Sequence, residues 1–273
     1  MPRAHRHHVP GHVWHITHRC HDRQFLLKFR PDRLNWLHWL YEAVRRYRLC
    51  VLYYTVTCNH IHLIASETER RHTIPRSMQL VAGRTAEEYN ARRGRRGAFW
   101  EDRYHATAVQ PGPHLLRCIA YLDLNMVRAG VVSHPADWPH CAFGELHSGR
   151  AGTRILDWRR LCELLHVNDR QELLNLHTEA LAAKADDSRV RQDFWTSSVA
   201  VGDREFVDSV AVLLQDRCPG RQTAQAAEGG PFVLREPRAV YGDEVQTCRL
   251  AGDNSVQLGG GPQSVRFPYM GWA

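Results

Sequence analysis

The segment that constrains this chain most is a pair of apolar runs joined by a short polar stretch, over residues 53–66. Apolar and β-branched residues lead into Cys58-Asn59 and a second apolar run follows, which is typical of two strands joined by a tight turn. His60 and His62 are two positions apart in the second strand, so their side chains project from the same face. The apolar residues that alternate with them are expected to face a core.

Two imidazoles side by side on a strand can form half of a divalent-metal site. Paired histidines also occur on solvated strand faces, and this chain has 18 histidines. Because a two-histidine pattern is weak evidence until other ligands are found, both interpretations stay open at this point.

The order of the predicted elements indicates the fold class. These elements are, in chain order, a strand at 11–19, a helix at 32–48, the two strands of the hairpin, a helix at 73–92, a strand at 103–110 and a helix at 114–128. Asp32 is the expected N-cap of the first helix. The β-α-β-β-α-β-α order predicts an α+β fold, namely a ferredoxin-like split βαβ with two helices on one side of a four-stranded antiparallel sheet.

Four segments are expected along the chain: a flexible basic arm at 1–10, a first domain at 11–150, a mainly helical C-terminal extension at 151–215 and a tail at 216–273. The extension has three periodic stretches, at 158–165, 169–183 and 203–215. The tail is rich in Gly, Pro, Gln and Ala, which favours extended or poorly ordered chain with room for one short hairpin.

The charge is unevenly distributed. Residues 1–150 hold 22 Lys and Arg against 12 Asp and Glu, a balance of +10, whereas the remainder holds 14 against 17, a balance of −3. A basic first half suggests binding to a polyanion, and an arginine-rich solvated surface is the alternative. No apolar run approaches the roughly 20 residues that cross a membrane, and no signal-peptide pattern is present, so a cytoplasmic protein is expected. The eight cysteines form no CxxC pair, which favours reduced thiols over a zinc or redox motif.

The helix predicted at 114–128 carries polar side chains beside an apolar stripe. Tyr121 and Asn125 are four positions apart and therefore lie on one face, which Arg117 shares and Arg128 extends by one turn. If this face meets the paired histidines, Asn125 adds an amide oxygen to them. Two imidazoles and one amide oxygen leave positions open for phosphate oxygens on Mg²⁺ or Mn²⁺. The alternative is a tyrosine at the edge of the core and an amide on the helix surface.

Four segments in this order resemble one known family: WHITHR at 14–19, NHIHL at 59–63, GAFWEDRY at 97–104 and YLDLNMVRAG at 121–130. Together they are similar to the REP-associated tyrosine transposases, a branch of the HUH single-strand, single-tyrosine transposases of insertion-sequence type. The likeness covers about residues 8–145. Three positions depart from the family pattern, since Cys20, Cys58 and Met126 stand where members usually have Gly, Pro and Pro, and none of these removes a ligand or the nucleophile.

The resemblance implies a function for each matched residue. His60, His62 and Asn125 would bind Mg²⁺ or Mn²⁺, and Tyr121 would be the nucleophile. Such enzymes cut single-stranded DNA near a foldback hairpin of the repetitive palindromic or insertion-end type. The tyrosine becomes joined to the 5′ end, and the free 3′-hydroxyl can later rejoin strands. Residues 11–150 would then form the HUH domain, with Tyr121 on its catalytic-tyrosine helix.

Binding of single-stranded DNA calls for a basic groove with aromatic platforms. The candidates are Arg3, Arg6, Arg19, Arg92, Arg93, Arg95, Arg96, Trp100, Arg103, Tyr104, Arg117 and Arg128. For Trp100, a core position that closes the sheet edge is an equally good interpretation.

Two other functions remain to be weighed. A non-catalytic regulator that binds DNA hairpins could use the same fold, but binding alone needs neither the proposed ligands nor Tyr121. A small-molecule metallohydrolase would leave the charge of the first half unexplained. A homodimer is compatible with the sequence.

Overall fold

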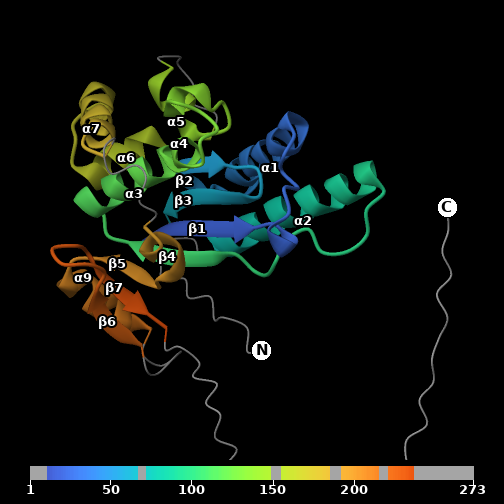
Figure 1. Ribbon diagram of the computed structural model, residues 1–273. Helices are drawn as coiled ribbons and strands as arrows, with labels where there is room; N and C mark the ends of the chain where they lie inside the picture. The colour runs from blue at the N-terminus through green and yellow to red at the C-terminus, as the bar shows by residue number, and fades with distance from the viewer. Residues whose placement is uncertain (1–10, 67–71, 149–154, 185–191, 215–220, 237–273) are drawn as a thin grey trace, which may run out of the picture. The chain divides into compact units, whose positions relative to one another are not determined.

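The structure of the chain is a computed structural model that describes residues 11–66, 72–148, 155–184, 192–214 and 221–236 (Figure 1). All of these belong to one compact unit, Met1–Pro237, so the boundary expected near residue 150 does not separate two compact units. The predicted basic arm, with Arg3 and Arg6, lies outside the described residues. No helix in the described ranges is long and apolar enough to cross a membrane.

A single mixed sheet of seven strands runs through this unit, in the order β2-β3-β1-β4-β5-β7-β6. The strands are β1 Val13–Arg19, β2 Cys50–Val56, β3 His60–Ser66, β4 His105–Val109, β5 Ala200–Gly202, β6 Gln222–Gln225 and β7 Phe232–Arg235. The first four pair antiparallel at every step, whereas β5 lies parallel to β4. The α+β class is confirmed, but the predicted four-strand count is wrong because three short strands extend the sheet beyond β4.

The hairpin of β2 and β3 lies at one end of this sheet, and its strand–turn–strand prediction is confirmed. The turn is closed by a hydrogen bond from the amide of Thr57 to the carbonyl of His60, 2.9 Å long. The Thr57 hydroxyl also accepts the backbone N–H of His60 at 3.1 Å. Ile61 and Leu63 are fully buried on the face opposite the histidines, as expected from the alternation of a strand.

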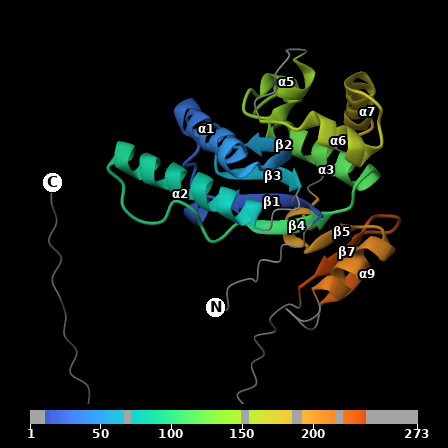
Figure 2. The same ribbon diagram turned by 180° about the vertical axis from the view of Figure 1, so that it is seen from behind.

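The helices are α1 Arg30–Tyr47, α2 Thr73–Arg93, α3 Pro113–Asp123, α4 Asn125–Arg128, α5 Ala142–His147, α6 Trp158–Leu165, α7 Arg170–Ala182, α8 Phe194–Ser197 and α9 Arg204–Leu213. Two short 3₁₀ turns lie at His21–Arg23 and Pro135–Asp137. Figure 2 shows α1 and α2 packed side by side. The predicted extension at 151–215 is mainly helical in its described part, and β5 within it joins the sheet.

The N-cap prediction for Asp32 is wrong. Helix α1 begins two residues earlier with Phe29 as its N-cap, and Asp32 is 2% exposed. Its carboxylate accepts a hydrogen bond from Arg92 and lies 3.9 Å from the guanidinium of Arg93. Asp32 therefore joins α1 to the end of α2 instead of starting α1.

The third predicted helix is not continuous. It divides at Leu124, whose φ of −74° and ψ of 0° separate α3 from α4. The guanidinium of Arg128 donates a 2.6 Å hydrogen bond to the carbonyl of Tyr121 across this break. Asn125 therefore starts a second short helix, and its direction relative to Tyr121 depends on the break as well as on their spacing.

A buried carboxylate fixes the end of α3. Asp123 accepts a hydrogen bond from the Tyr53 hydroxyl at 2.7 Å and lies 2.7 Å from Nε2 of His177. The side chains of Asp123 and His177 are 0% and 1% exposed. The other ring nitrogen of His177 is 3.0 Å from His147. Residues from β2, α3, α5 and α7 thus meet at one polar cluster, which locates the helix that carries Tyr121.

Replacing Tyr53 with Phe should destabilise the protein by about 1.5–3 kcal/mol, because it removes a hydrogen bond to a buried charged group with little change in volume. The free energy of unfolding, measured by urea denaturation, tests this. Tyr47→Phe, the same change at a half-buried position on α1, is the matched control. Equal stability losses in the two variants would contradict the assigned role of the cluster.

Candidate active site

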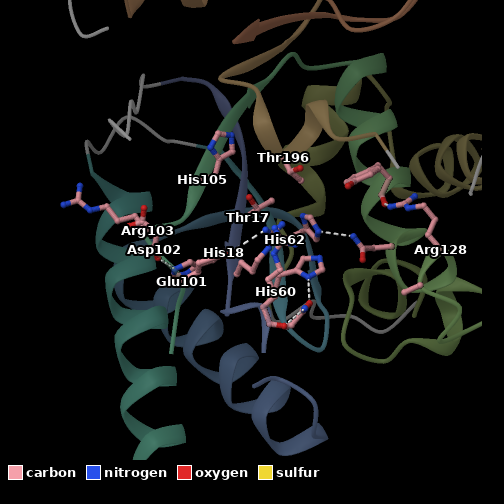
Figure 3. A pocket seen from close by; sticks show the side chains of 16 residues that line it. Thr17, His18, His60, His62, Glu101, Asp102, Arg103, His105, Arg128 and Thr196 are labelled. Atoms are coloured by element: carbon pink, nitrogen blue, oxygen red, sulfur yellow. Dashed lines mark hydrogen bonds and ion pairs between the residues drawn. The ribbon is translucent and has the colours of Figure 1, made fainter. Parts of the chain in front are cut away.

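A pocket of about 640 Å³ opens where β1, β3, the start of β4, the α3–α4 break and α8 come together (Figure 3). Its lining consists of Thr17, His18, Arg19, Arg23, Asn59, His60, His62, Glu101, Asp102, Arg103, His105, Tyr121, Asn125, Arg128, Ala129 and Thr196. The structure therefore brings together the predicted nucleophile and all three predicted metal ligands, which are far apart in the sequence.

His62 lies at the back of the pocket and is 2% exposed. Its Nδ1 is 2.9 Å from Nε2 of His15, on the neighbouring strand β1. Its Nε2 is 3.0 Å from the amide nitrogen of Asn125. Both ring nitrogens of this buried imidazole therefore have polar partners, as a buried polar side chain requires.

His60 lies nearer the pocket mouth and is fixed by the turn. Its Nδ1 is 2.7 Å from the side-chain oxygen of Asn59 and 2.9 Å from the Thr57 hydroxyl. The ring centroids of His60 and His62 are 4.9 Å apart, with the planes at 84°. The predicted pairing of these two imidazoles on one face of β3 is confirmed.

Tyr121 lies beside the imidazole pair and is 6% exposed. Its ring centroid is 6.1 Å from that of His62, in an edge-to-face arrangement. The guanidinium of Arg128 covers the ring at 4.3 Å from its centroid. This cation–π contact holds the phenol ring in place beside the imidazole pair.

The donor set fits a divalent ion if the Asn125 amide presents its oxygen. Imidazoles suit first-row transition ions and an amide oxygen suits harder ions, and Mn²⁺ accepts both. Among the residues that the structure describes, no three His, Cys, Asp or Glu side chains are grouped as a metal site. A metal held by His60 and His62 would therefore depend on Asn125 as its third protein ligand.

Burial keeps the histidines behind the pocket neutral. Desolvation lowers the pKa of His15 to about 3, against the opposing effect of its hydrogen bond to the carbonyl of Trp195. Desolvation likewise lowers the pKa of His105, and the carbonyl of Ser198 opposes that shift. Burial thus favours the neutral form of both His15 and His105.

Only some of the predicted DNA-binding arginines reach this pocket. Arg19, Arg103 and Arg128 line it, and Arg19 also lies 3.9 Å from Glu101 in an exposed ion pair. The remaining described candidates lie outside the lining: Arg92 and Arg93 at Asp32, Arg95 on the carbonyls of Gly97 and Ala98, and Arg96 and Arg117 exposed on the surface.

The two aromatic candidates are mainly structural. Trp100 stacks on His18 with centroids 4.0 Å apart, and its indole N–H donates to the carbonyl of Ala82 at 3.0 Å. These contacts favour the interpretation of Trp100 as closing the sheet edge. Tyr104 is 5% exposed and belongs to the core, and its role as a stacking platform stays a prediction.

Several pocket residues were missed from the sequence. Thr17 lines the pocket and His15 lies behind it; they share one face of β1 by simple alternation, so the pattern that identified His60 and His62 could have found them. Arg23 ends the 3₁₀ turn at His21–Arg23, and Asn59 lies in the turn between β2 and β3. Thr196 comes from α8 and reaches the pocket because β5 pairs with β4, a long-range contact with no local signal.

Comparisons with known proteins find one family model and several solved structures that match parts of this chain. Residues 8–123 match the family model described as "Transposase IS200 like". Two solved structures that match are a REP-associated tyrosine transposase bound to a REP hairpin and a transposase from Deinococcus radiodurans. The first has 18% identity, covers 57% of this chain and 94% of its own, and has a TM-score of 0.46. The second has 16% identity, covers 47% and 92%, and has a TM-score of 0.32.

Comparison with curated proteins gives no match. The family match includes His60, His62 and Tyr121, and it ends two residues before Asn125. Over residues 8–123, the chain is therefore similar to the IS200-like transposases.

Proposed function

We propose that this protein is a metal-dependent endonuclease and strand-transferase that acts on single-stranded DNA near a foldback hairpin. The observation that carries the proposal is the convergence of Tyr121, His60, His62 and Asn125 in one pocket lined by arginines. The match of residues 8–123 to the transposase family model supports a reaction on DNA. The mechanism follows from what each side chain can do at that pocket.

Tyr121 is the proposed nucleophile. Its hydroxyl oxygen attacks the phosphorus of the scissile phosphodiester, and the bond from phosphorus to the 3′ oxygen breaks. The phenol proton is released, the departing 3′ oxygen takes up a proton, and the 5′-phosphate end of the cut DNA remains joined to Tyr121. Because the covalent link conserves the bond energy, the 3′-hydroxyl can reverse the step and reseal DNA without a nucleotide cofactor.

His60, His62 and Asn125 are the proposed ligands of Mg²⁺ or Mn²⁺, which when bound would stabilise the charge that develops on the phosphate oxygens. Arg128 holds the Tyr121 carbonyl and covers its ring, so it positions the nucleophile. Arg19, Arg23 and Arg103 line the pocket as well and are suited to contact the DNA backbone.

A regulator that binds DNA hairpins without cutting them is the second candidate. It accounts for the arginines but leaves the convergence of two histidines, an amide and a tyrosine without a purpose. A small-molecule metallohydrolase is less well supported, since the pocket is lined by Arg19, Arg23, Arg103 and Arg128. Cleavage of DNA that stops on chelation of divalent ions separates the first proposal from both.

Tyr121→Phe is expected to abolish the covalent protein–DNA adduct while hairpin binding is retained, because only the nucleophilic oxygen is lost. Adducts on a labelled foldback oligonucleotide are scored by denaturing gel, and binding by fluorescence anisotropy. Tyr89→Phe, on α2, is the matched control and should form adducts. An adduct in the Tyr121 variant would exclude this residue as the nucleophile.

Asn125→Ala should raise the Mn²⁺ concentration that gives half-maximal cleavage by at least about tenfold. Loss of a residue that only hydrogen-bonds to a metal ligand typically weakens metal binding by about tenfold or more, and loss of a direct ligand should weaken it at least as much. Titration of Mn²⁺ into metal-free protein provides the measurement, with cleavage of the same oligonucleotide as the readout. Asn175→Ala, at an exposed site on α7, should behave as the wild type. An unchanged Mn²⁺ requirement in Asn125→Ala would remove this amide from the ligand set.

Arg103→Ala should weaken hairpin binding and reduce the slope of log affinity against log salt by about 1, since one phosphate contact is lost. Anisotropy titrations at several salt concentrations give the slope. Arg159→Ala, at an exposed position on α6 outside the pocket, should leave it unchanged. The same slope in both variants would show that DNA does not contact Arg103.

A further inference from the structure

The segment around α8 lies outside the family match, yet it reaches the back of the pocket. The carbonyl of Trp195 is 2.9 Å from Nδ1 of His15. The same carbonyl and that of Ser198 accept hydrogen bonds from the Thr107 hydroxyl, at 3.2 and 2.6 Å. Parallel pairing of β5 with β4 and burial of the Trp195 ring fix this segment against the sheet.

A chain of hydrogen bonds runs from this segment to the imidazole of His62. A carbonyl oxygen can only accept, so Nδ1 of His15 carries the proton. In neutral His15, Nε2 is then an acceptor, and it lies 2.9 Å from Nδ1 of His62, which must donate. His62 is consequently protonated on Nδ1 and has its lone pair on Nε2.

The orientation of the Asn125 amide in this structure matches this assignment. The amide nitrogen of Asn125, which can only donate, lies 3.0 Å from Nε2 of His62. That contact requires a lone pair on Nε2, in agreement with the assignment made from the Trp195 carbonyl. The opposite tautomer of His62 would place two donors against each other at Asn125.

We propose that residues 194–198 complete the metal site by holding His62, through His15, in the tautomer that presents Nε2 to the pocket. His15 is thus a positioning residue, and the C-terminal extension contributes to the site without touching the ion. The inference rests on the proposed function, since it assumes that His62 is a metal ligand. It assigns a role to a part of the chain that the family match does not cover.

The physical reason is general for histidine ligands. A ligating imidazole binds best when its other ring N–H donates to a fixed acceptor, which sets the tautomer and orientation and raises the basicity of the ligating nitrogen. In this protein that acceptor is a neutral imidazole, itself oriented by a backbone carbonyl. Loss of such a partner typically costs 10–100-fold in metal affinity.

The test compares Mn²⁺ binding by the full chain and its variants, measured as free Mn²⁺ by electron paramagnetic resonance. His15→Leu should raise the dissociation constant for Mn²⁺ by about 10–100-fold. His15→Gln should restore most of the affinity, because its amide can donate to Trp195 and accept from His62. Thr107→Val is the matched control, since it loses hydrogen bonds to the same segment but leaves the imidazole chain intact.

Wild-type affinity in a folded His15→Leu variant would overturn the inference, and so would equal losses in His15→Leu and Thr107→Val. If a thermal melt shows that His15→Leu is not folded, the tautomer of His62 is determined directly in the wild-type protein. Long-range proton–nitrogen correlation spectra of histidine-labelled protein, with His62 assigned from a His62→Gln variant, should show a proton on Nδ1. A proton on Nε2 of His62 would equally overturn the inference.

These outcomes are separate from those that test the proposed function. Adduct formation by Tyr121 with an unchanged Mn²⁺ affinity in His15→Leu would retain the function and remove the role of His15. Weakened Mn²⁺ binding in His15→Leu without any adduct in the wild type would retain the role of His15 and remove the proposed DNA cleavage.

Discussion

The candidate site depends on the cost of burying polar side chains on the inner face of a sheet. His15 and His62 are 0% and 2% exposed, and an imidazole at that depth is tolerated only when its ring nitrogens are hydrogen-bonded. The chain from Asn125 through His62 and His15 to Trp195 meets this requirement. Satisfying it also fixes the orientation of each ring, so the same bonds that permit burial organise the pocket.

The features predicted from the sequence were those encoded by local patterns. The alternation of β3 placed His60 and His62 on one face, and the turn at Cys58-Asn59 follows from residues that lie next to each other. Helices α7 and α9 were found from their periodic stretches at 169–183 and 203–215. In the structure, the carboxylates of Asp169 and Asp203 cap them by accepting the backbone N–H of Glu172 and Phe206.

The features that were missed depend on contacts between distant parts of the chain. Strand β5 is three residues long and forms because β4 offers a free edge to residues about ninety positions later. The short hairpin expected in the tail is present as β6 and β7, but the pairing of β7 with β5, which adds this hairpin to the sheet, was missed. The break at Leu124 has no local signal, since leucine favours helix and the apolar stripe continues through it. Asp32 was taken for an N-cap because an acidic residue in a first turn looks the same whether it caps or pairs with arginine.

The sequence also does not show which arginines bind a ligand and which stabilise the fold. Arg92 and Arg128 were both assigned to DNA, yet one pairs with Asp32 between two helices and the other holds the carbonyl of Tyr121. A guanidinium has five donors, so one arginine can stabilise the fold and still present charge to a ligand. Net charge thus predicts what kind of molecule the protein binds. Which arginines contact that molecule can be predicted only from the structure.

The placement of Tyr121 explains why a stability cluster lies so close to the reaction centre. Asp123 is two residues further along and is held by Tyr53 and His177, from elements on either side of α3. Burying a carboxylate is costly unless it is fully paired, so the end of α3 has one favourable position. That position sets Tyr121 beside His62, and the Arg128 contact across the helix break does the same from the other direction. If Tyr121 is the nucleophile, as proposed, a side chain fixed from both sides would need little reorganisation for an in-line attack on a phosphate.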